Sequence, residues 1–574
     1  MKIKRAAEYW RLWLVITGVI LLPVFLLVRA SNLLVLDSQD HGVSLKEEGD
    51  DRTVRVEKLV AYRGLIKDRN DELLAVSTPV KSLYADPKHI DYEEIPALAK
   101  ALGWSQEALR SKLAFYQNKR FMYLETQMPP HLANEILSHK FSGVYGRTEY
   151  KRYYPAGEVT SHLLGITDAK ENGIEGIELS YNDWLKGEQG KKKVLKDRYQ
   201  QVIKELELLQ APESGKDLQL TIDLKLQYLA YKELKHAIAK QGAKSGWLVT
   251  IDAKTGEILA MVNQPAYNPN DRSSIKSGTT RNRAVTDLFE PGSTVKPFTI
   301  AAALESGRFN KFDTINTAPG YVRVGQKTFL DPVNYGVMDL GKILKKSSQV
   351  GITKIALSMQ PEEIRDLFFK MGFGQAIGIG FPGERSGRLP TRTHWADVER
   401  ANFAFGYGLS VNAIQLAQAY VTLANGGKYV PISLIKGAEH PEPVQVLDAT
   451  VANDVVDMLA SVTEAGGTAT TAAIDDYSVA GKTGTAHKLG KSGAYADDKY
   501  LALFAGFAPV ESPRLVTVVV VDEPPAYGDY SGGKAAAPIF GSVMEKSLKA
   551  LNVPPLNTHR YASNALASYA GGAQ

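Results

Sequence analysis

The sequence predicts an α+β protein with a helix-flanked antiparallel sheet domain at residues 214–550, which follows a membrane helix and a smaller α+β module at residues 53–213. Three observations support this architecture. The chain begins with an uncharged apolar run, it has a Pro/Gly/Ser-rich break at residues 212–215, and short strand-like runs alternate with helical patterns after that break. A chain of 574 residues is also too long to form one hydrophobic core.

The apolar run at residues 12–28 predicts a membrane-spanning helix. Thirteen of its seventeen residues are Leu, Ile, Val or Phe, which together favour insertion by at most about 4–8 kcal/mol. Seventeen residues is the short end of a spanning helix. The flank before it carries Lys2, Lys4, Arg5 and Arg11 against Glu8. We therefore expect a cytoplasmic tail at residues 1–11, a retained anchor at 12–29 and the rest outside the inner membrane, with a cleaved signal or a buried core helix as the alternative.

The segments between this anchor and the second domain have distinct patterns. Residues 30–52 are polar and are predicted to be a linker. In the module that follows, residues 53–56 resemble a strand, and residues 91–140 favour amphipathic helices, one of them beginning near Ser105. The charged run at residues 186–204 is typical of a solvated face or hairpin.

The C-terminal domain is predicted to combine helices with short strands. Turn residues separate the strands, which favours antiparallel pairing. The expected elements are a helix at 224–241, strands at 246–251 and 258–262, helices within 296–470, and strands at 477–482, 501–507 and 515–521. Residues 551–574 are rich in Pro, Ser, Ala and Gly and are predicted to be a disordered tail.

Composition excludes several classes of function. The net charge is only +5, and no basic stripe interleaved with aromatic residues is present, so nucleic acid is not an expected partner. The chain contains no cysteine, which excludes disulfides, thiolate zinc sites and a cysteine nucleophile. Its ten histidines never lie within four residues of each other, so no metal site is predicted. No organic cofactor is predicted either.

Ser293 and Lys296 form the first candidate chemical motif. Ser293 follows a Glu-Pro-Gly turn and precedes a helical pattern. Positions three apart share a helix face, so a neutral Lys296 could accept the proton of the Ser293 hydroxyl. The pKa of such a lysine has to fall from about 10.4 to about 7. Burial and the positive charge of Lys482 are the expected causes. The competing structural interpretation of Ser293 is a helix N-cap.

A second motif, Lys482-Thr483-Gly484-Thr485, follows strand-like residues. A lysine and two hydroxyls on an edge strand can hold a carboxylate and bind a peptide by strand addition. The backbone N–H groups of Ser293 and Thr485 are expected to face a developing oxyanion.

In this order, Ser-x-x-Lys, a Ser-x-Asn type element and Lys-Thr-Gly are the signature of penicillin-binding proteins. The chain resembles class B penicillin-binding proteins, and most closely the septal, cell-division transpeptidase of Gram-negative bacteria (the penicillin-binding protein 3 type). Supporting blocks stand at residues 63–70, 152–157 with His162, 173–178, 381–384 and 405–409.

The resemblance implies a serine D,D-transpeptidase that acts on D-Ala-D-Ala stem peptides and is acylated by β-lactams, with residues 53–213 as a non-catalytic pedestal. It implies an enzyme of the inner membrane with a periplasmic catalytic domain, whose partners are a SEDS-type glycosyltransferase and other division proteins. The implied catalytic residues are Ser293, Lys296, Ser347 and Lys482, and the implied substrate-binding residues are Gln349, Thr483, Gly484 and Thr485.

The middle motif departs from the family pattern, because Gln349 stands where Asn is expected after Ser347 and Ser348. Gln presents the same amide one methylene further out, and a misplacement of about 1 Å would cost on the order of a hundredfold in rate. A literal Ser-x-Asn at residues 410–412 is the competing second motif. The departure indicates a divergent member or a second copy of the division enzyme. It also leaves open a catalytically weak scaffold or β-lactam receptor, while a secreted β-lactamase is disfavoured by the anchor and the pedestal.

Overall fold

The computed structural model describes residues 3–34, 39–40, 43–44, 53–197, 202–276, 278–392, 394–489, 495–525 and 530–555. The chain divides into two compact units. The first comprises Met1–Tyr62 and Gly187–Gly215, and the second comprises Arg63–Lys186 and Lys216–Gln574. Most of the predicted linker and of the predicted disordered tail lies outside the described residues. The domain boundaries drawn from the sequence therefore stay predictions.

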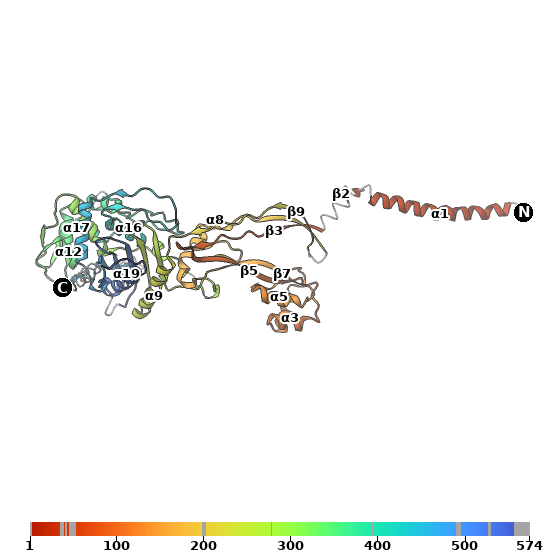
Figure 1. Cartoon of the computed structure of the whole chain (residues 1–574), viewed down its shortest axis with the longest axis horizontal. Helices are drawn as coiled ribbons and strands as arrows, with labels where there is room; N and C mark the ends of the chain where they lie inside the picture. Colours follow the sequence, from red (N-terminus) through yellow and green to blue (C-terminus); the bar gives the residue numbers. More distant parts are fainter. Residues whose placement is uncertain are drawn as a thin grey trace, which may run out of the picture. The chain divides into compact units, whose positions relative to one another are not determined.

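The first unit contains one long helix, α1 (Ile3–Leu34), drawn as a single uninterrupted helix in Figure 1. It is longer than the predicted segment at residues 12–29, because the flanking residues favour helix and continue its backbone hydrogen bonds. Its stretch Tyr9–Ser31, 23 residues with a mean hydropathy of 2.4, is long and apolar enough to cross a membrane.

The strands of the first unit form two small antiparallel sheets. Strands β1 (Gln39–Asp40) and β2 (Val43–Ser44) pair within the predicted linker. Strands β3 (Val54–Leu59), β8 (Gly190–Lys196) and β9 (Val202–Gln210) form the second sheet in the order β3-β8-β9. The charged run thus forms an antiparallel strand pair, which agrees with the second of the two alternatives, a solvated face or a hairpin, that the sequence favours. Its alternating charges face each other across the strands, for example Lys193 and Glu207 at 3.2 Å.

The part of the second unit that precedes residue 220 is an α+β arrangement with its own core. Strands β4 (Ile66–Lys67), β5 (Leu73–Ala85), β6 (Met122–Met128), β7 (Val144–Tyr153) and β10 (Leu218–Gln219) form one sheet, on which helices α3 (Ile95–Leu102), α4 (Gln106–Phe115) and α5 (Pro130–Ser138) pack. The expected helix start is confirmed, because Ser105 Oγ accepts a hydrogen bond from Ala108 N at 3.1 Å.

A five-stranded antiparallel sheet forms the centre of the remaining part. Its order is β12 (Ile258–Gln264), β11 (Ser245–Asp252), β21 (Leu515–Asp522), β20 (Tyr495–Ala508) and β19 (Ala480–Leu489). The expected strand at 477–482 begins later and continues further, because Tyr477 closes a turn on Ile474 and pairing with β20 starts at Ala480. The Lys-Thr-Gly-Thr motif therefore lies inside an edge strand.

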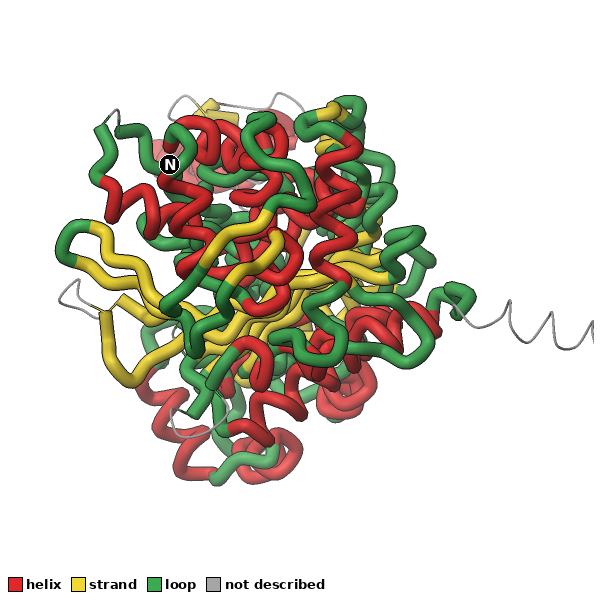
Figure 2. The backbone as a smooth tube through the Cα atoms, turned by 90° about the vertical axis from the view of Figure 1, so that its left-hand side faces the viewer, coloured by secondary structure: helices red, strands yellow, loops and turns green. Residues whose placement is uncertain are grey.

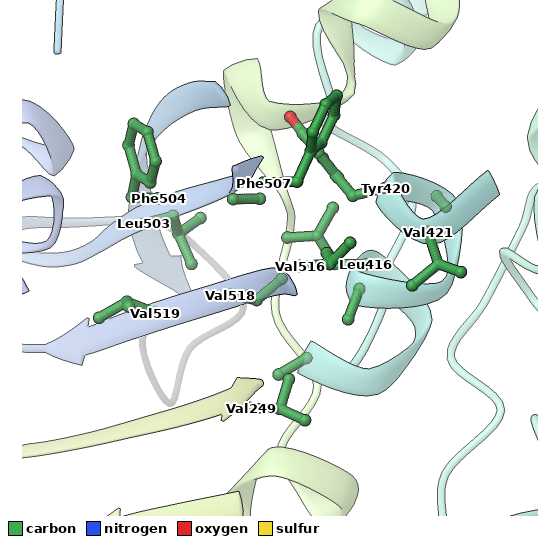
Figure 3. Packing of buried hydrophobic residues seen from close by; sticks show 14 of the residues in the cluster. Val249, Leu416, Tyr420, Val421, Leu503, Phe504, Phe507, Val516, Val518 and Val519 are labelled. Carbon is green, nitrogen blue, oxygen red and sulfur yellow. The ribbon is translucent and has the colours of Figure 1, made fainter. Parts of the chain in front are cut away.

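Helices cover both faces of this sheet (Figure 2). Helices α9 (Leu224–Gln241) and α19 (Ala537–Ala550) lie on one face, where the Phe504 and Phe540 rings are 4.6 Å apart. Helix α16 (Ala413–Ala424) lies on the other, and Figure 3 shows its Leu416 beside Val516 of β21. A strand that is buried on both faces has a nearly continuous apolar sequence, and the sequence of β21 shows this pattern.

Further helices of this unit connect these elements. They are α6 (Ser161–Leu164), α7 (Gly176–Ser180), α8 (Asn182–Lys186), α10 (Arg283–Thr286), η3 (Gly292–Val295), α11 (Lys296–Glu305), α12 (Leu340–Lys346), α13 (Gln349–Leu357), α14 (Pro361–Lys370), α15 (Asp397–Ala404), α17 (Ala449–Ala460) and α18 (Gly532–Ala535). The small antiparallel pair β14 (Tyr321–Val324) and β15 (Lys327–Leu330) lies among them.

Candidate active site

Ser293 lies in the one-turn helix η3, directly before α11. Gly292 adopts a left-handed conformation (φ +54°) and donates its N–H to Gly406 O at 3.2 Å. Tyr420 of α16 fixes the same turn by donating its hydroxyl to Thr294 O at 2.9 Å. Ser293 is partly exposed, whereas both of its neighbours are buried. The N-cap interpretation of Ser293 is wrong, because the residue preceding η3 is Pro291.

Lys296 is fully buried at the first position of α11. Its Nζ donates to Ser347 O at 2.6 Å and to Ser348 O at 3.3 Å, and lies 3.2 Å from Ser347 Oγ. Burial lowers the pKa of Lys296 from 10.5 to about 7, against the opposing effect of the Asp331 carboxylate. A neutral amine that donates both hydrogens to carbonyls keeps a lone pair with which to accept a proton.

Of the two expected causes of this low pKa, burial is confirmed, and the charge of Lys482 is wrong. Burial, and not the charge of Lys482, lowers the pKa of Lys296. Lys482 is itself fully buried, and its own pKa falls well below the usual value because of burial and the nearby charge of Lys296. Two ammonium groups in one dry site repel each other, so proton uptake by one disfavours the charged form of the other.

Strand β19 carries Lys482, Thr483, Gly484 and Thr485 past the Ser293 turn. Lys482 Nζ lies 3.4 Å from Thr483 Oγ1, and Thr485 Oγ1 accepts a hydrogen bond from Gly532 N at 3.0 Å. A Cβ on Gly484 would lie 3.0 Å from Pro291 O, so only glycine lets the strand pass this close to the turn. Because β19 is the edge of its sheet, one side of its backbone is available for pairing.

The turn between α12 and α13 supplies the third part of the site. Ser347 ends α12 in a left-handed conformation (φ +56°, ψ +38°), which costs about 1–2 kcal/mol in a residue with a Cβ. Ser348 caps α13 by accepting from Gly351 N at 2.9 Å. Gln349 is the exposed first residue of α13. The structure therefore brings Ser347 to Lys296 and sets Gln349 beside them.

The competing Ser-x-Asn at residues 410–412 is a structural element. Asn412 is buried at the N-cap of α16, and its side-chain amide donates to Arg385 O at 2.7 Å and Val285 O at 3.2 Å. Its hydrogen bonds hold α16 to α10 and to the loop that contains Arg385, so it is not the second motif.

Two carboxylates of the site are missed by sequence reasoning. Asp331 accepts from Ser348 Oγ at 2.5 Å and from Gln349 N at 2.6 Å, which anchors the α12–α13 turn. Glu290 accepts from Gly408 N at 2.8 Å and from the Tyr495 hydroxyl at 2.9 Å. Asp331 lies in a loop with no helical or strand periodicity, and only its position before Pro332 marks a turn. Glu290 belongs to the Glu-Pro-Gly turn, but its hydrogen bonds could not be predicted, because its partners Gly408 and Tyr495 are distant in the sequence.

Comparisons with known proteins agree with this geometry. Residues 246–545 match the penicillin-binding protein transpeptidase domain, and residues 58–220 match the penicillin-binding protein dimerisation domain. The chain is 41% identical to the probable peptidoglycan D,D-transpeptidase PbpC of Pseudomonas aeruginosa over 546 residues, which covers 94% of this chain and 96% of that protein.

Two further relatives cover most of the chain. The peptidoglycan D,D-transpeptidase FtsI of Escherichia coli K12 is 41% identical over 567 residues, 96% of this chain and 95% of that protein. The crystal structure of penicillin-binding protein 3 from Mycobacterium tuberculosis complexed with aztreonam has a TM-score of 0.68 at 27% identity, covering 87% of this chain and 98% of that one. The chain belongs to the penicillin-binding protein family. Within it, the chain is a class B member of the penicillin-binding protein 3 type, a group in which a dimerisation domain precedes a transpeptidase domain.

Proposed function

We propose that this protein is a membrane-anchored peptidoglycan D,D-transpeptidase that cross-links stem peptides through an acyl-enzyme on Ser293. The observation that carries the proposal is the placement of the buried Lys296 amine 3.2 Å from Ser347 Oγ and three residues from Ser293. Burial lowers the pKa of this amine to about 7, so that a large fraction of it is neutral near pH 7. A serine next to a neutral lysine is an activated nucleophile.

The proposed acylation step breaks the terminal D-Ala-D-Ala bond. Ser293 Oγ attacks the carbonyl of the penultimate D-Ala and passes its proton to Lys296 Nζ. The backbone N–H groups of Ser293 and Thr485 stabilise the oxyanion. The amine of the leaving D-Ala takes up a proton relayed through Lys296 and Ser347, and an ester to Ser293 remains. In a β-lactam the broken C–N bond lies in a ring, so the leaving amine stays attached to the adduct.

In the second step an amine of a neighbouring stem peptide attacks the ester. It forms the cross-linking amide, its proton passes through Lys296 and Ser347, and Ser293 regains its hydroxyl proton. We assign the substrate contacts to the edge of β19. The Lys482 ammonium, when protonated, and the hydroxyls of Thr483 and Thr485 bind the terminal carboxylate, Gly484 allows close approach, and Gln349 donates its amide to the peptide.

We further propose that α1 anchors the protein in the inner membrane with its N-terminus in the cytoplasm and its enzymatic domain in the periplasm. The basic residues before the apolar stretch support this orientation. A role in septal synthesis, with a SEDS-type glycosyltransferase and other division proteins as partners, fits the relationship to FtsI. The transmembrane helix and the pedestal are the surfaces for such contacts.

Turnover of a D-Ala-D-Ala thioester mimic separates this enzyme from a scaffold or receptor that retains the fold. The full-length protein in detergent is expected to release thiol over many cycles and to transfer the acyl group to an added amine. Stoichiometric adduct formation with fluorescent penicillin, without any turnover of the thioester, would instead favour the receptor alternative, which the Gln349 substitution keeps open.

A further inference from the structure

A cavity of about 270 Å³ lies where α10 and the residues after it meet the central sheet. Arg283 and Asp287 line it at the two ends of α10, and Trp247 lines it from β11. Phe289 also lines it, with its ring 6.4 Å from that of Trp247. Of the described residues that line this cavity, none is among those assigned above to catalysis or substrate binding. It is therefore separate from the proposed active site.

The guanidinium groups of Arg281 and Arg283 share one carboxylate at this cavity. Arg281 Nη2 donates to Asp287 Oδ2 at 3.0 Å, and Arg283 Nη1 donates to the same oxygen at 2.8 Å. A guanidinium group carries five N–H donors, and these bonds use one donor from each side chain. Within the part of the chain that the structure describes, neither side chain donates another hydrogen bond. Both arginines therefore have donors to spare.

The two lysines that line the cavity are balanced, in contrast to the arginines. Lys488 of β19 lies 2.5 Å from Asp522 and 2.8 Å from Glu523. Lys244 lies 2.8 Å from the same Glu523. Two ammonium groups thus meet two carboxylates, whereas two guanidinium groups meet only Asp287. The excess positive charge of the cavity lies with the arginines.

Trp247 gives an independent indication of a ligand that accepts hydrogen bonds. Its side chain lines the cavity, and the residue is only 2% exposed. Its indole Nε1 is buried and has no hydrogen-bond partner among the described residues. An indole N–H can only donate, and a buried donor without an acceptor is rare in native proteins. An anion held by the neighbouring arginines would supply that acceptor.

We propose that this cavity binds an oxyanion through the guanidinium groups of Arg281 and Arg283 and the indole N–H of Trp247. A carboxylate and a phosphate group both present two oxygens that match the paired donors of a guanidinium group. A volume of about 270 Å³ is slightly below the range of pockets that enclose a drug-sized organic ligand. The ligand is therefore free phosphate or the anionic end of a larger molecule.

The test measures anion binding to the full-length protein in detergent by isothermal titration calorimetry. Sodium phosphate and sodium acetate are titrated separately at pH 7, with sodium chloride at equal ionic strength as the reference. The variants are Arg281→Gln, Arg283→Gln and Trp247→Phe, the last of which removes the N–H and keeps an aromatic ring. Arg308→Gln is the matched control, because Arg308 is a surface arginine that pairs with Glu363 and does not line the cavity.

Wild type and Arg308→Gln are expected to bind one anion per chain with a Kd below about 10 mM. Arg281→Gln and Arg283→Gln should each weaken this binding about tenfold, and Trp247→Phe should weaken it about threefold. Tighter binding of phosphate than of acetate would identify a phosphate ligand, and the reverse order would identify a carboxylate.

The proposal is overturned if neither anion binds wild type saturably, or if binding survives unchanged in both arginine variants. A loss of equal size in Arg308→Gln would also overturn it, because binding would then follow the net charge of the surface. Labelling with fluorescent penicillin shows independently that each variant is folded. The exposed side chain of Arg281 keeps the test decisive even where the buried substitution Trp247→Phe prevents folding.

Discussion

The β19 side of the site belongs to a sheet whose central strands are buried on both faces, whereas the facing side is the short turn between α12 and α13. Backbone pairing with β20 fixes Lys482 and Thr485 in register with Ala505 and Ala502. The turn depends on Asp331, which lies in a loop and holds Ser348 and Gln349 through side-chain hydrogen bonds. Ser347 is moreover held in a strained left-handed conformation.

This difference indicates where the site tolerates change. Strand β19, although it lies at the edge of the sheet, is held by backbone pairing with β20 along its length, and its Lys-Thr-Gly-Thr residues match the family pattern. A turn held by one carboxylate fixes the backbone of residue 349 and leaves its side chain exposed. The departure from the family pattern, Gln349, falls on that exposed side chain.

The largest expected effect is the loss of the buried base. Lys296→Met removes the amine but keeps a long, flexible side chain at this buried position. The rate of acylation by penicillin should fall by about a hundredfold to ten-thousandfold. Stopped-flow measurement of fluorescent penicillin binding tests this. The melting temperature shows separately how much the loss of the hydrogen bonds to Ser347 O and Ser348 O destabilises the fold. An acylation rate within about threefold of wild type would exclude Lys296 as the base.

Breaking the anchor of the turn should cost less. In Asp331→Asn the neutral amide replaces a carboxylate that accepts from Ser348 Oγ and Gln349 N. The resulting displacement of Ser347 is expected to slow acylation by about tenfold to a hundredfold. Asp339→Asn is the matched control, because Asp339 caps the other end of α12 by accepting from Lys342 N. Equal losses in the two variants would mean that general destabilisation of α12 explains the effect.

The pH dependence of acylation should report Lys296 directly. The amine is protonated and inactive below a pKa of about 7, so the rate should fall about tenfold per pH unit below that value and level off above it. The Asp331 carboxylate raises the pKa of Lys296. Asp331→Asn should therefore move this limb to lower pH, the opposite of what a merely structural loss would do. A limb that stays in place in the variant would contradict the electrostatic coupling.

The smallest effect is expected at Gln349. Its backbone position is set by Asp331 and the start of α13, so Gln349→Asn should change acylation by penicillin less than about threefold. Second-order acylation constants for both proteins test this. A gain of tenfold or more in the variant would show that Gln349 impairs the site, and the scaffold alternative would then gain support.

Much of the fold could be predicted, because the relevant signals are local. The helix Leu224–Gln241 was expected at these same positions. In the structure Asp223 caps its start, and Gly242 ends it in a left-handed conformation. The beginning of β19 was not predictable from its apolar residues. Tyr477 and Val479 look like strand residues, but tertiary contacts decide where pairing with β20 starts.

The site itself was predictable where motifs mark it and not where it depends on distant contacts. Ser293, Lys296 and Lys482 stand in short motifs whose order is informative. Asp331 lies in a loop, and only folding brings it to Ser348. Lys327 lies in the β14–β15 hairpin, and only folding brings it to a cavity that Gln349 also lines. Burial was correctly expected as a cause of the low pKa of Lys296, whereas the expected contribution of the Lys482 charge was wrong.

The most direct test of the central claim is covalent labelling of the full-length protein with fluorescent penicillin, followed by mapping of the modified peptide by mass spectrometry. One adduct per wild-type chain, located on Ser293 and absent from a folded Ser293→Ala variant, is the predicted result. An adduct that persists in Ser293→Ala, or that maps to another residue, would contradict the assignment of Ser293 as the nucleophile.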